Sequence, residues 1–376
     1  GTAGQVLTVN SGATAATFAD AGGGADLYAA NESSPTAQPS ATGANAIAIG
    51  DGAVSGGGNS LAFGLNTDAT YSSAVAIGTG AQATFYNAIA IGTNANASGN
   101  IGLALGYGAT ASGAFSTAIG LNSSGSASQA VGSSATALGG SRAYGTDSFA
   151  AAIANNTSSY GATSTGSVAI GLRAKASGQY SFASGYFAEA TGYYDIAMGN
   201  NSSATGGFVT GGSIAIGTQA GAAQVGSVAI GMRAYSNIKG KFAFTNNTFN
   251  NPPDGSAQYG LYVLKQSTTD ATASTMVSDN NADTMGSPST TNQIVLPNNS
   301  CYGFTGTVIA REQASATNDF AVWEIKGGAV RAGSASTIAL GSYNINKISE
   351  SSGATNWSIA LSADTTNGAV AITVTG

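Results

Sequence analysis

The sequence predicts an all-β, trimeric protein in which a parallel β-solenoid (a β-roll of 14-residue coils) is followed by an antiparallel β-sandwich. The first observation behind this prediction is a set of glycines spaced 14 residues apart, each closing a pentad that alternates small and aliphatic residues. These are Gly50, Gly64, Gly78, Gly92, Gly106 and Gly120. A period this short is typical of solenoids, in which each coil is stable only against its neighbours. The second is the composition of 55 glycines, 43% apolar and 7% charged residues, which argues against a solvated disordered chain.

Residues 1–43 are predicted to form an N-terminal hairpin and linker that serve for attachment. Two short strand-like runs, at 5–9 and 13–18, flank the turn sequence Asn-Ser-Gly. A glycine-rich stretch then continues to residue 43. Because a lone hairpin is marginal in water, we expect this segment to dock on a particle or baseplate protein.

The solenoid is predicted over residues 44–238. In every regular coil the residue two before the anchor glycine is alanine, and its neighbours are mostly aliphatic. Side chains alternate faces along a strand, so both faces of these strands are apolar and both need burial. One face can pack inside the coil, and we expect the alanine face to receive a second copy in a coaxial trimer. The predicted subunit interface is therefore Ala48, Ala62, Ala76, Ala90, Ala104 and Ala118.

A second column lies two residues after each anchor glycine and predicts a left-handed turn in the first block of coils. It consists there of Gly and Asn, which tolerate positive φ. In the second block it becomes Arg173, Phe187, Asn201, Gln219 and Arg233, so the turn must either change or be strained. Between Gly120 and Gly171 the register is poor. Segments 137–139 and 152–154 resemble degenerate units.

Residues 239–260 are predicted to be a linker, because the sequence Asn-Asn-Pro-Pro-Asp-Gly at 250–255 breaks the pattern. Beyond it the period is lost, and conventional strand sequences separated by turns predict a C-terminal β-sandwich over residues 261–376. The expected strands are 261–265, 293–296, 303–311, 320–325, 358–362 and 370–374. Cys301 is the single cysteine, so no intrachain disulfide can form, and we expect it to be buried as a small hydrophobe.

Several function classes are excluded or disfavoured. The chain has no histidine, which excludes Ser-His-Asp and Cys-His triads and His-ligated metal sites. We therefore expect no catalytic, cofactor-binding or metal-binding residues, and no enzyme. A net charge of −6 without a basic stripe makes nucleic acid an unsuitable partner. No apolar run reaches the length of about 20 residues that a membrane-spanning helix needs.

The densest aromatic cluster leaves two interpretations open. Exposed rings in this cluster would stack on sugars of a cell surface, whereas buried rings would form a ladder or the trimer core, which we favour. The candidate glycan-binding residues are Tyr180, Tyr186, Phe187, Tyr193 and Tyr194. The nearby Arg173, Glu189 and Asp195 are expected to form a solvated rim rather than to bind a ligand.

The pentads resemble the head repeats of YadA-like trimeric autotransporter adhesins. The closest matches are residues 167–171 and 227–231, both Ser-Val-Ala-Ile-Gly. This resemblance covers about half of the chain. It implies a left-handed parallel β-roll, three chains around one axis, and binding to host surfaces.

The ends of the chain resemble a different family. Residues 1–8 are similar to a linker motif frequent in bacteriophage tail fibres, and residues 268–272, 295–300 and 360–368 are similar to C-terminal domains of phage fibre proteins. This second resemblance implies a location in the virion.

Together these features predict a homotrimeric structural or adhesive fibre protein, similar to a phage tail fibre, that presents a module binding a cell-surface glycan or protein. The first alternative is a bacterial surface adhesin or extracellular filament subunit. The third hypothesis, an enzyme acting on surface polysaccharide, is the least favoured.

Overall fold

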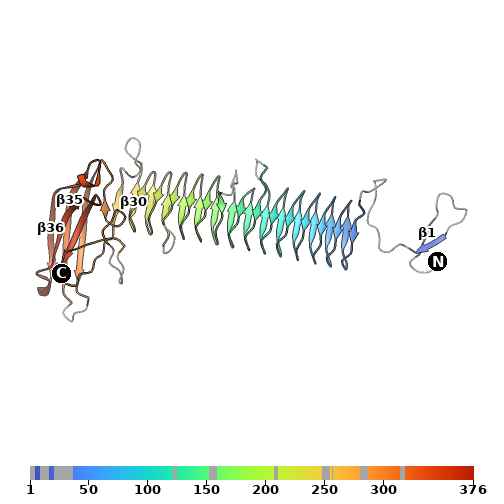
Figure 1. Ribbon diagram of the computed structural model, residues 1–376, viewed down its shortest axis with the longest axis horizontal. Helices are drawn as coiled ribbons and strands as arrows, with labels where there is room; N and C mark the ends of the chain where they lie inside the picture. Colours follow the sequence, from blue (N-terminus) through green and yellow to red (C-terminus); the bar gives the residue numbers. More distant parts are fainter. Residues whose placement is uncertain are drawn as a thin grey trace.

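The computed structural model describes residues 5–8, 17–20, 37–121, 125–151, 159–206, 211–247, 255, 257–279, 287–313 and 318–376. Strands β1 (Gln5–Thr8) and β2 (Thr17–Asp20) pair antiparallel, with Gln5 opposite Asp20, as a hairpin requires. The turn expected at 10–12 lies outside the described residues. From residue 40 to residue 245 the chain forms a row of stacked coils (Figure 1).

Each coil contributes one strand to each of two parallel sheets. The first sheet consists of β4 (Ile47–Ile49), β6 (Leu61–Phe63), β8 (Val75–Ile77), β10 (Ile89–Ile91), β12 (Leu103–Leu105), β14 (Thr117–Ile119), β16 (Thr136–Leu138), β18 (Phe149–Ala151), β20 (Val168–Ile170), β22 (Phe182–Ser184), β24 (Ile196–Met198), β26 (Ile214–Ile216), β28 (Val228–Gly231) and β30 (Phe242–Thr245). We call it the long-strand sheet.

The second sheet, which we call the short-strand sheet, is built from strands of two residues. It consists of β3 (Ser40–Ala41), β5 (Val54–Ser55), β7 (Asp68–Ala69), β9 (Gln82–Ala83), β11 (Asn96–Ala97), β13 (Thr110–Ala111), β15 (Gln129–Ala130), β17 (Arg142–Ala143), β19 (Gly161–Ala162), β21 (Lys175–Ala176), β23 (Glu189–Ala190), β25 (Ser203–Ala204), β27 (Gly221–Ala222) and β29 (Tyr235–Ser236). The parallel β-solenoid predicted from the glycine period is thus confirmed.

The register between coils follows the 14-residue period. Ala90 lies beside Ala76 on one side and Ala104 on the other, and the Gly92 amide donates to the Ile77 carbonyl oxygen at 2.8 Å. Gly92 has φ +127°, and a Cβ there would lie 2.7 Å from the Gly106 carbonyl oxygen. The anchor position therefore demands glycine for two reasons: its left-handed backbone and the close approach of the next coil.

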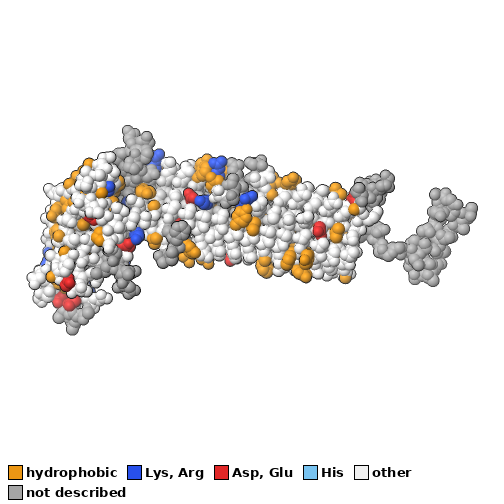
Figure 2. Space-filling view, viewed as in Figure 1, with side chains coloured by type: hydrophobic (Ala, Val, Ile, Leu, Met, Phe, Trp, Pro, Cys, Tyr) orange, Lys and Arg blue, Asp and Glu red, His pale blue; other side chains and the backbone are white. Residues whose placement is uncertain are grey.

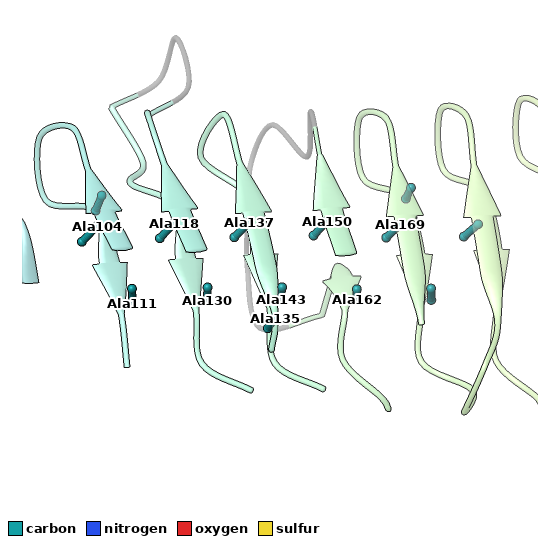
Figure 3. Close-up of a cluster of buried hydrophobic side chains, with 14 of the residues drawn as sticks. Ala104, Ala111, Ala118, Ala130, Ala135, Ala137, Ala143, Ala150, Ala162 and Ala169 are labelled. Carbon is teal, nitrogen blue, oxygen red and sulfur yellow. The ribbon is translucent and has the colours of Figure 1, made fainter. Parts of the chain in front are cut away.

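The solenoid interior is filled by small side chains from both sheets (Figure 3). Ala62, Ala76, Ala90, Ala104 and Ala118 are all 0% exposed within a single chain, and Ala48 in the first coil packs against the same core. The prediction that these alanines form the subunit interface is therefore wrong. The two strands of a 14-residue coil lie too close together to hold more than methyl groups, so the alanine face points inward and the aliphatic face outward.

The left-handed turn after the anchor glycine is kept in both blocks of coils. Arg173, Phe187, Gln219 and Arg233 have φ between +53° and +58°, close to the +53° of Asn66. The turn does not change, so these non-glycine residues carry the cost of a left-handed backbone, about 1–2 kcal/mol each.

The strands of the irregular region between Gly120 and Gly171 stay in register. Ala118, Ala137, Ala150 and Ala169 stack in order from β14 to β20. The unit expected at 137–139 is confirmed by β16. The unit expected at 152–154 lies outside the described residues, and the strand that continues the stack before it is β18 at Phe149–Ala151.

The last coil is covered by a strand that runs in the opposite direction. β31 (Tyr259–Leu261) pairs antiparallel with β30 and ends the long-strand sheet. The predicted linker 239–260 thus contains β30 and the first two residues of β31, so the solenoid continues past residue 238. An antiparallel strand at the end of a repeat stack satisfies hydrogen bonds that would otherwise face water or another chain.

The C-terminal part is an antiparallel sandwich, as predicted. One sheet holds β34 (Ser300–Arg311), β35 (Phe320–Arg331) and β36 (Ala339–Glu350), and the other holds β32 (Ser274–Thr275), β33 (Ile294–Val295), β37 (Ser358–Asp364) and β38 (Ala369–Thr375). Short 3₁₀ turns occur at Ala335–Thr337 and Ser352–Ala354. Trp323 and Ile325 of the first sheet share a core with Leu361 and Ile372 of the second.

Two expectations about the sandwich are wrong. Cys301 is exposed rather than buried, because it lies on the outward side of β34. The expected strand 261–265 is reduced to its first residue, Leu261, which ends β31.

Lys241 is buried where the solenoid meets β31, with only 2% of its surface exposed. Its Nζ donates to the Tyr235 carbonyl oxygen at 3.3 Å and lies 5.6 Å from the centre of the Tyr262 ring. Burial disfavours the charged form and lowers the pKa of Lys241 to about 8. Burial likewise raises the pKa of Tyr302 to about 12 and that of Tyr262 further.

Replacing Ala90 with Leu should destabilise the solenoid by about 1–3 kcal/mol or more, because the interior has no room for an isobutyl group. Thermal unfolding followed by circular dichroism measures the effect. Thr79→Leu, at an exposed turn, is the matched control and should leave the transition nearly unchanged. Equal stability of Ala90→Leu and Thr79→Leu would contradict the inward orientation of the alanine column.

Stability should rise with pH above about 8 because of Lys241. Between this pKa and the ordinary value of 10.5, the unfolded chain holds a proton that the folded chain has lost. Above pH 10 the buried tyrosines act in the opposite direction, since the unfolded chain then loses protons that the folded chain keeps. We expect Lys241→Met to be more stable than wild type by about 2–3 kcal/mol at pH 7, with a gap that narrows toward pH 10.

The pH dependence can be measured as denaturation midpoints at several pH values. Lys326→Met, at an exposed position, is the control and should show no such convergence. A difference in unfolding free energy between wild type and Lys241→Met that stays constant from pH 7 to pH 10 would contradict the lowered pKa of Lys241.

Candidate functional site

The outer face of the long-strand sheet is mostly apolar along the solenoid, with polar residues at Thr117, Thr136 and Ser184. Its residues flank the buried alanines, and parallel pairing stacks them coil upon coil, as with Ile89 beside Leu103 and Ile91 beside Leu105. In the single chain, 50% of Phe63, 39% of Leu105 and 51% of Phe244 remain exposed. We call this surface the aliphatic face.

An apolar surface of this extent is unusual on a monomeric protein and marks a contact with another molecule. Hydrophobic side chains reach the surface at several places along the solenoid in Figure 2, whereas charged ones are few. The sequence correctly predicted that one apolar face of these strands stays exposed in a single chain. It assigned this role to the alanine face, whereas the structure assigns it to the aliphatic face.

The five aromatic residues singled out in the sequence form two groups at different turns of the coil. Tyr180 and Tyr194 stack with ring centres 5.4 Å apart and 14° between the planes, and Tyr193 lies beside them. Tyr186 and Phe187 meet edge to face at 4.5 Å on the turn that follows the anchor glycine. The rings do form ladders between coils, but Tyr194 is 57% exposed, so the favoured buried ladder or core is not what the single chain shows.

A third aromatic group was missed in the sequence. The rings of Tyr71 and Phe85 stack at 5.4 Å, and the Tyr86 ring meets both edge to face. The signal was present, because residues 71 and 85 are separated by one period and therefore occupy equivalent positions in adjacent coils.

Beside the second aromatic group lies a hollow of about 210 Å³, formed where the turn after the anchor glycine joins the short-strand sheet. We call it the Arg173 hollow, and its lining residues are Ser159, Tyr160, Arg173, Lys175, Phe187 and Glu189. The Arg173 guanidinium lies 4.8 Å from the centre of the Phe187 ring, which Tyr160 meets edge to face at 6.1 Å. Lys175 Nζ and Glu189 Oε1 form an ion pair at 2.7 Å across adjacent strands.

Asp195 does not belong to a solvated rim, as expected from the sequence, but is fully buried inside the coil. Its Oδ2 accepts from the Gly192 amide at 2.6 Å, and its Oδ1 accepts from the amide and hydroxyl of Ser213 at 2.7 and 2.9 Å. In a regular coil this amide bonds the carbonyl three residues earlier, as Ser181 does with Gly178. Since four extra residues precede Ser213, Asp195 replaces that lost acceptor.

Among the described residues, no three His, Cys, Asp or Glu side chains lie close enough to hold a metal ion. No helix in the described ranges is long and apolar enough to cross a bilayer. The chemistry that the described surface offers is therefore apolar contact, aromatic stacking and charge recognition.

Comparison with models of protein families shows which segments of the solenoid match a known repeat. The model of the YadA head domain repeat (two copies) matches residues 41–67, 72–95, 97–123, 162–188, 190–208 and 211–234. No curated protein matches the chain. The matched segments between residues 41 and 234 are thus similar to YadA head repeats, which indicates an adhesin-like head, and residues 124–161 are not matched.

Replacing Asp195 with Ser, the residue at the equivalent position of the neighbouring coils, should destabilise the solenoid by about 1–3 kcal/mol, because the buried Ser213 amide loses its acceptor. Chemical denaturation measures the change. Ser181→Ala, which removes one hydroxyl bond to the Gly178 carbonyl in a regular coil, is the control and should cost about 1 kcal/mol or less. A milder effect of Asp195→Ser than of Ser181→Ala would show that the carboxylate does not repair the insertion.

Proposed function

Because the matched segments between residues 41 and 234 are similar to YadA head repeats, we propose that this protein is a homotrimeric adhesive fibre whose three solenoids pack together through their aliphatic faces. The observation that carries the proposal is the aliphatic face, which is mostly apolar from β4 to β30. Residues such as Ile89 and Leu103 are only partly covered in one chain, and large apolar residues recur at their position in most coils. Three copies around one axis bury all three faces with closed symmetry.

In this proposal the solenoid is a stiff shaft or head, and its ends serve for attachment and presentation. The hairpin of β1 and β2 docks on a particle or baseplate protein, and the C-terminal sandwich presents a surface for a cell-surface glycan or protein. Three chains provide three copies of each weak site, so that avidity supplies the affinity. The resemblance of both ends to phage fibre sequences favours a tail fibre of a virion.

A second candidate is a bacterial surface adhesin or extracellular filament subunit, which the YadA head repeats favour directly. Gold-labelled antibodies against the sandwich would separate the two. Labelled tails of virus-like particles support the fibre, and labelled cell surfaces without particles support the adhesin. We assign no catalytic role, and new reducing ends after incubation with surface polysaccharides would contradict this.

The trimer can be tested through the aliphatic face. Replacing Ile89 and Ile91 together with Asp should convert the assembly to monomers, because two buried carboxylates per chain would face each other across the axis. Native mass spectrometry of the wild type should give three times the chain mass of 36.4 kDa. Thr79→Asp with Gln82→Asp adds the same charges elsewhere and should leave the trimer intact. A wild-type monomer at micromolar concentration would refute the proposal.

A further inference from the structure

We infer that the Arg173 hollow binds a single acidic sugar residue, with the anionic group on Arg173 and the sugar ring against Phe187 and Tyr160. This inference rests on the proposed adhesive function and names the ligand class of one site on the solenoid. The shared chemistry is an anion (carboxylate or phosphate) attached to a sugar with an apolar ring face.

Arg173 is a half-buried cation whose donors meet no acceptor among the described residues. Its guanidinium stacks on Phe187 but makes no hydrogen bond or ion pair with any residue that the structure describes. The other basic group in the hollow, Lys175, is paired with Glu189 at 2.7 Å. A stacked guanidinium holds its N–H groups in a fixed plane, which suits two parallel bonds to a carboxylate or phosphate.

The backbone at Arg173 and Phe187 is strained, because both residues have a side chain in a left-handed conformation. Both residues have left-handed φ, +57° and +53°, where the equivalent positions of the first block hold only Gly or Asn. Glycine or asparagine at either position would relieve this strain. The same strain occurs at Gln219 and Arg233, but only at Arg173 and Phe187 do the two side chains meet in a hollow, and strained positions often occur at ligand sites.

The size of the hollow limits the ligand. At about 210 Å³ it is smaller than the roughly 300–1,000 Å³ of pockets that enclose drug-sized molecules. It therefore fits one sugar residue or a branch tip rather than an extended chain. The Phe187 and Tyr160 rings offer the apolar contact that a sugar ring uses, and an inorganic anion would not use it.

The hollow lies away from the surface that assembly covers. Lys175 and Glu189 belong to the short-strand sheet, whereas the aliphatic face belongs to the long-strand sheet. A trimer would thus carry three accessible copies. Glu189 places a carboxylate at the edge of the site, so its charge weakens anion binding and its removal should strengthen it.

The inference is tested by saturation-transfer NMR on the full chain with four probes. These are galacturonate, glucose 6-phosphate, neutral galactose and inorganic phosphate. We expect millimolar binding of galacturonate, glucose 6-phosphate or both, and the stronger of the two identifies carboxylate or phosphate as the anion.

The variants use substitutions that the left-handed turn accepts. Arg173→Asn and Phe187→Asn should each weaken binding about tenfold or more without lowering the melting temperature. Glu189→Gln should strengthen it. Arg233→Asn is the matched control, because Arg233 has the same φ, within a degree, but bonds Gln219 outside the hollow. The Arg233→Asn variant should bind the acidic sugars as tightly as the wild type does.

Several results would overturn the inference. These are no binding of either acidic sugar, equal binding of galactose, equal binding of inorganic phosphate and of the sugar phosphate, or equal losses in Arg173→Asn and Arg233→Asn. Native mass measured on the same samples separates this failure from that of the proposed function. An intact trimer that attaches to cells but binds no acidic sugar would refute the acidic-sugar site and leave the proposed adhesive function standing.

Discussion

The narrow interior of the coil is the constraint on which the rest of the structure depends. Two strands joined into a 14-residue loop leave space for small side chains, mostly methyl and hydroxymethyl groups, which explains why Ala76, Ala90 and their equivalents are fully buried. Larger apolar side chains are forced onto the outside. The aliphatic face is thus the direct result of a core too thin to hold Ile or Leu, and burial of that face needs other copies of the chain.

A coil of this kind separates structural positions from variable ones. The anchor glycines and the inner alanines are fixed by backbone approach and by volume. The turns are free to carry other side chains once the chain accepts a left-handed backbone, as at Arg173 and Phe187. Each such side chain is repeated at a spacing of about 4.8 Å along the shaft, which aligns neighbours into stacks such as Tyr180 with Tyr194. Functional surface can therefore vary without disturbing the solenoid.

Much of this architecture could be predicted from the sequence because the period and the residue type coincide. The coils, their register and the antiparallel C-terminal part followed from glycine spacing and strand alternation. The sequence did not show which face of the long strands points into the coil. Alternation shows that the two faces differ, but it gives no distance between the two sheets. Strand β36 was also missed, since polar residues such as Asn344, Asn346 and Lys347 occur on both of its faces and obscure the alternation.

The candidate site was only partly accessible to sequence reasoning. Phe187 was singled out as part of an aromatic cluster, but its partner Tyr160 was not, although it directly precedes β19, which β21 separates from β23 in the same sheet. Arg173 and Glu189 were assigned to a solvated rim together with Asp195, which the structure buries. In the structure the Arg173 guanidinium lies over the Phe187 ring, whereas Asp195 is buried inside its coil. The sequence shows the insertion before Ser213, but it does not show that Asp195 of the preceding coil supplies the missing hydrogen-bond acceptor.

The most direct test of the central claim is a cryo-electron microscopy map of the purified protein, viewed in cross-section through the solenoid. The account predicts three coils per section, with Ile89, Ile91 and their equivalents meeting at the centre and the alanine columns enclosed within each coil. A map with one coil per section, its aliphatic side chains surrounded by solvent, would contradict it.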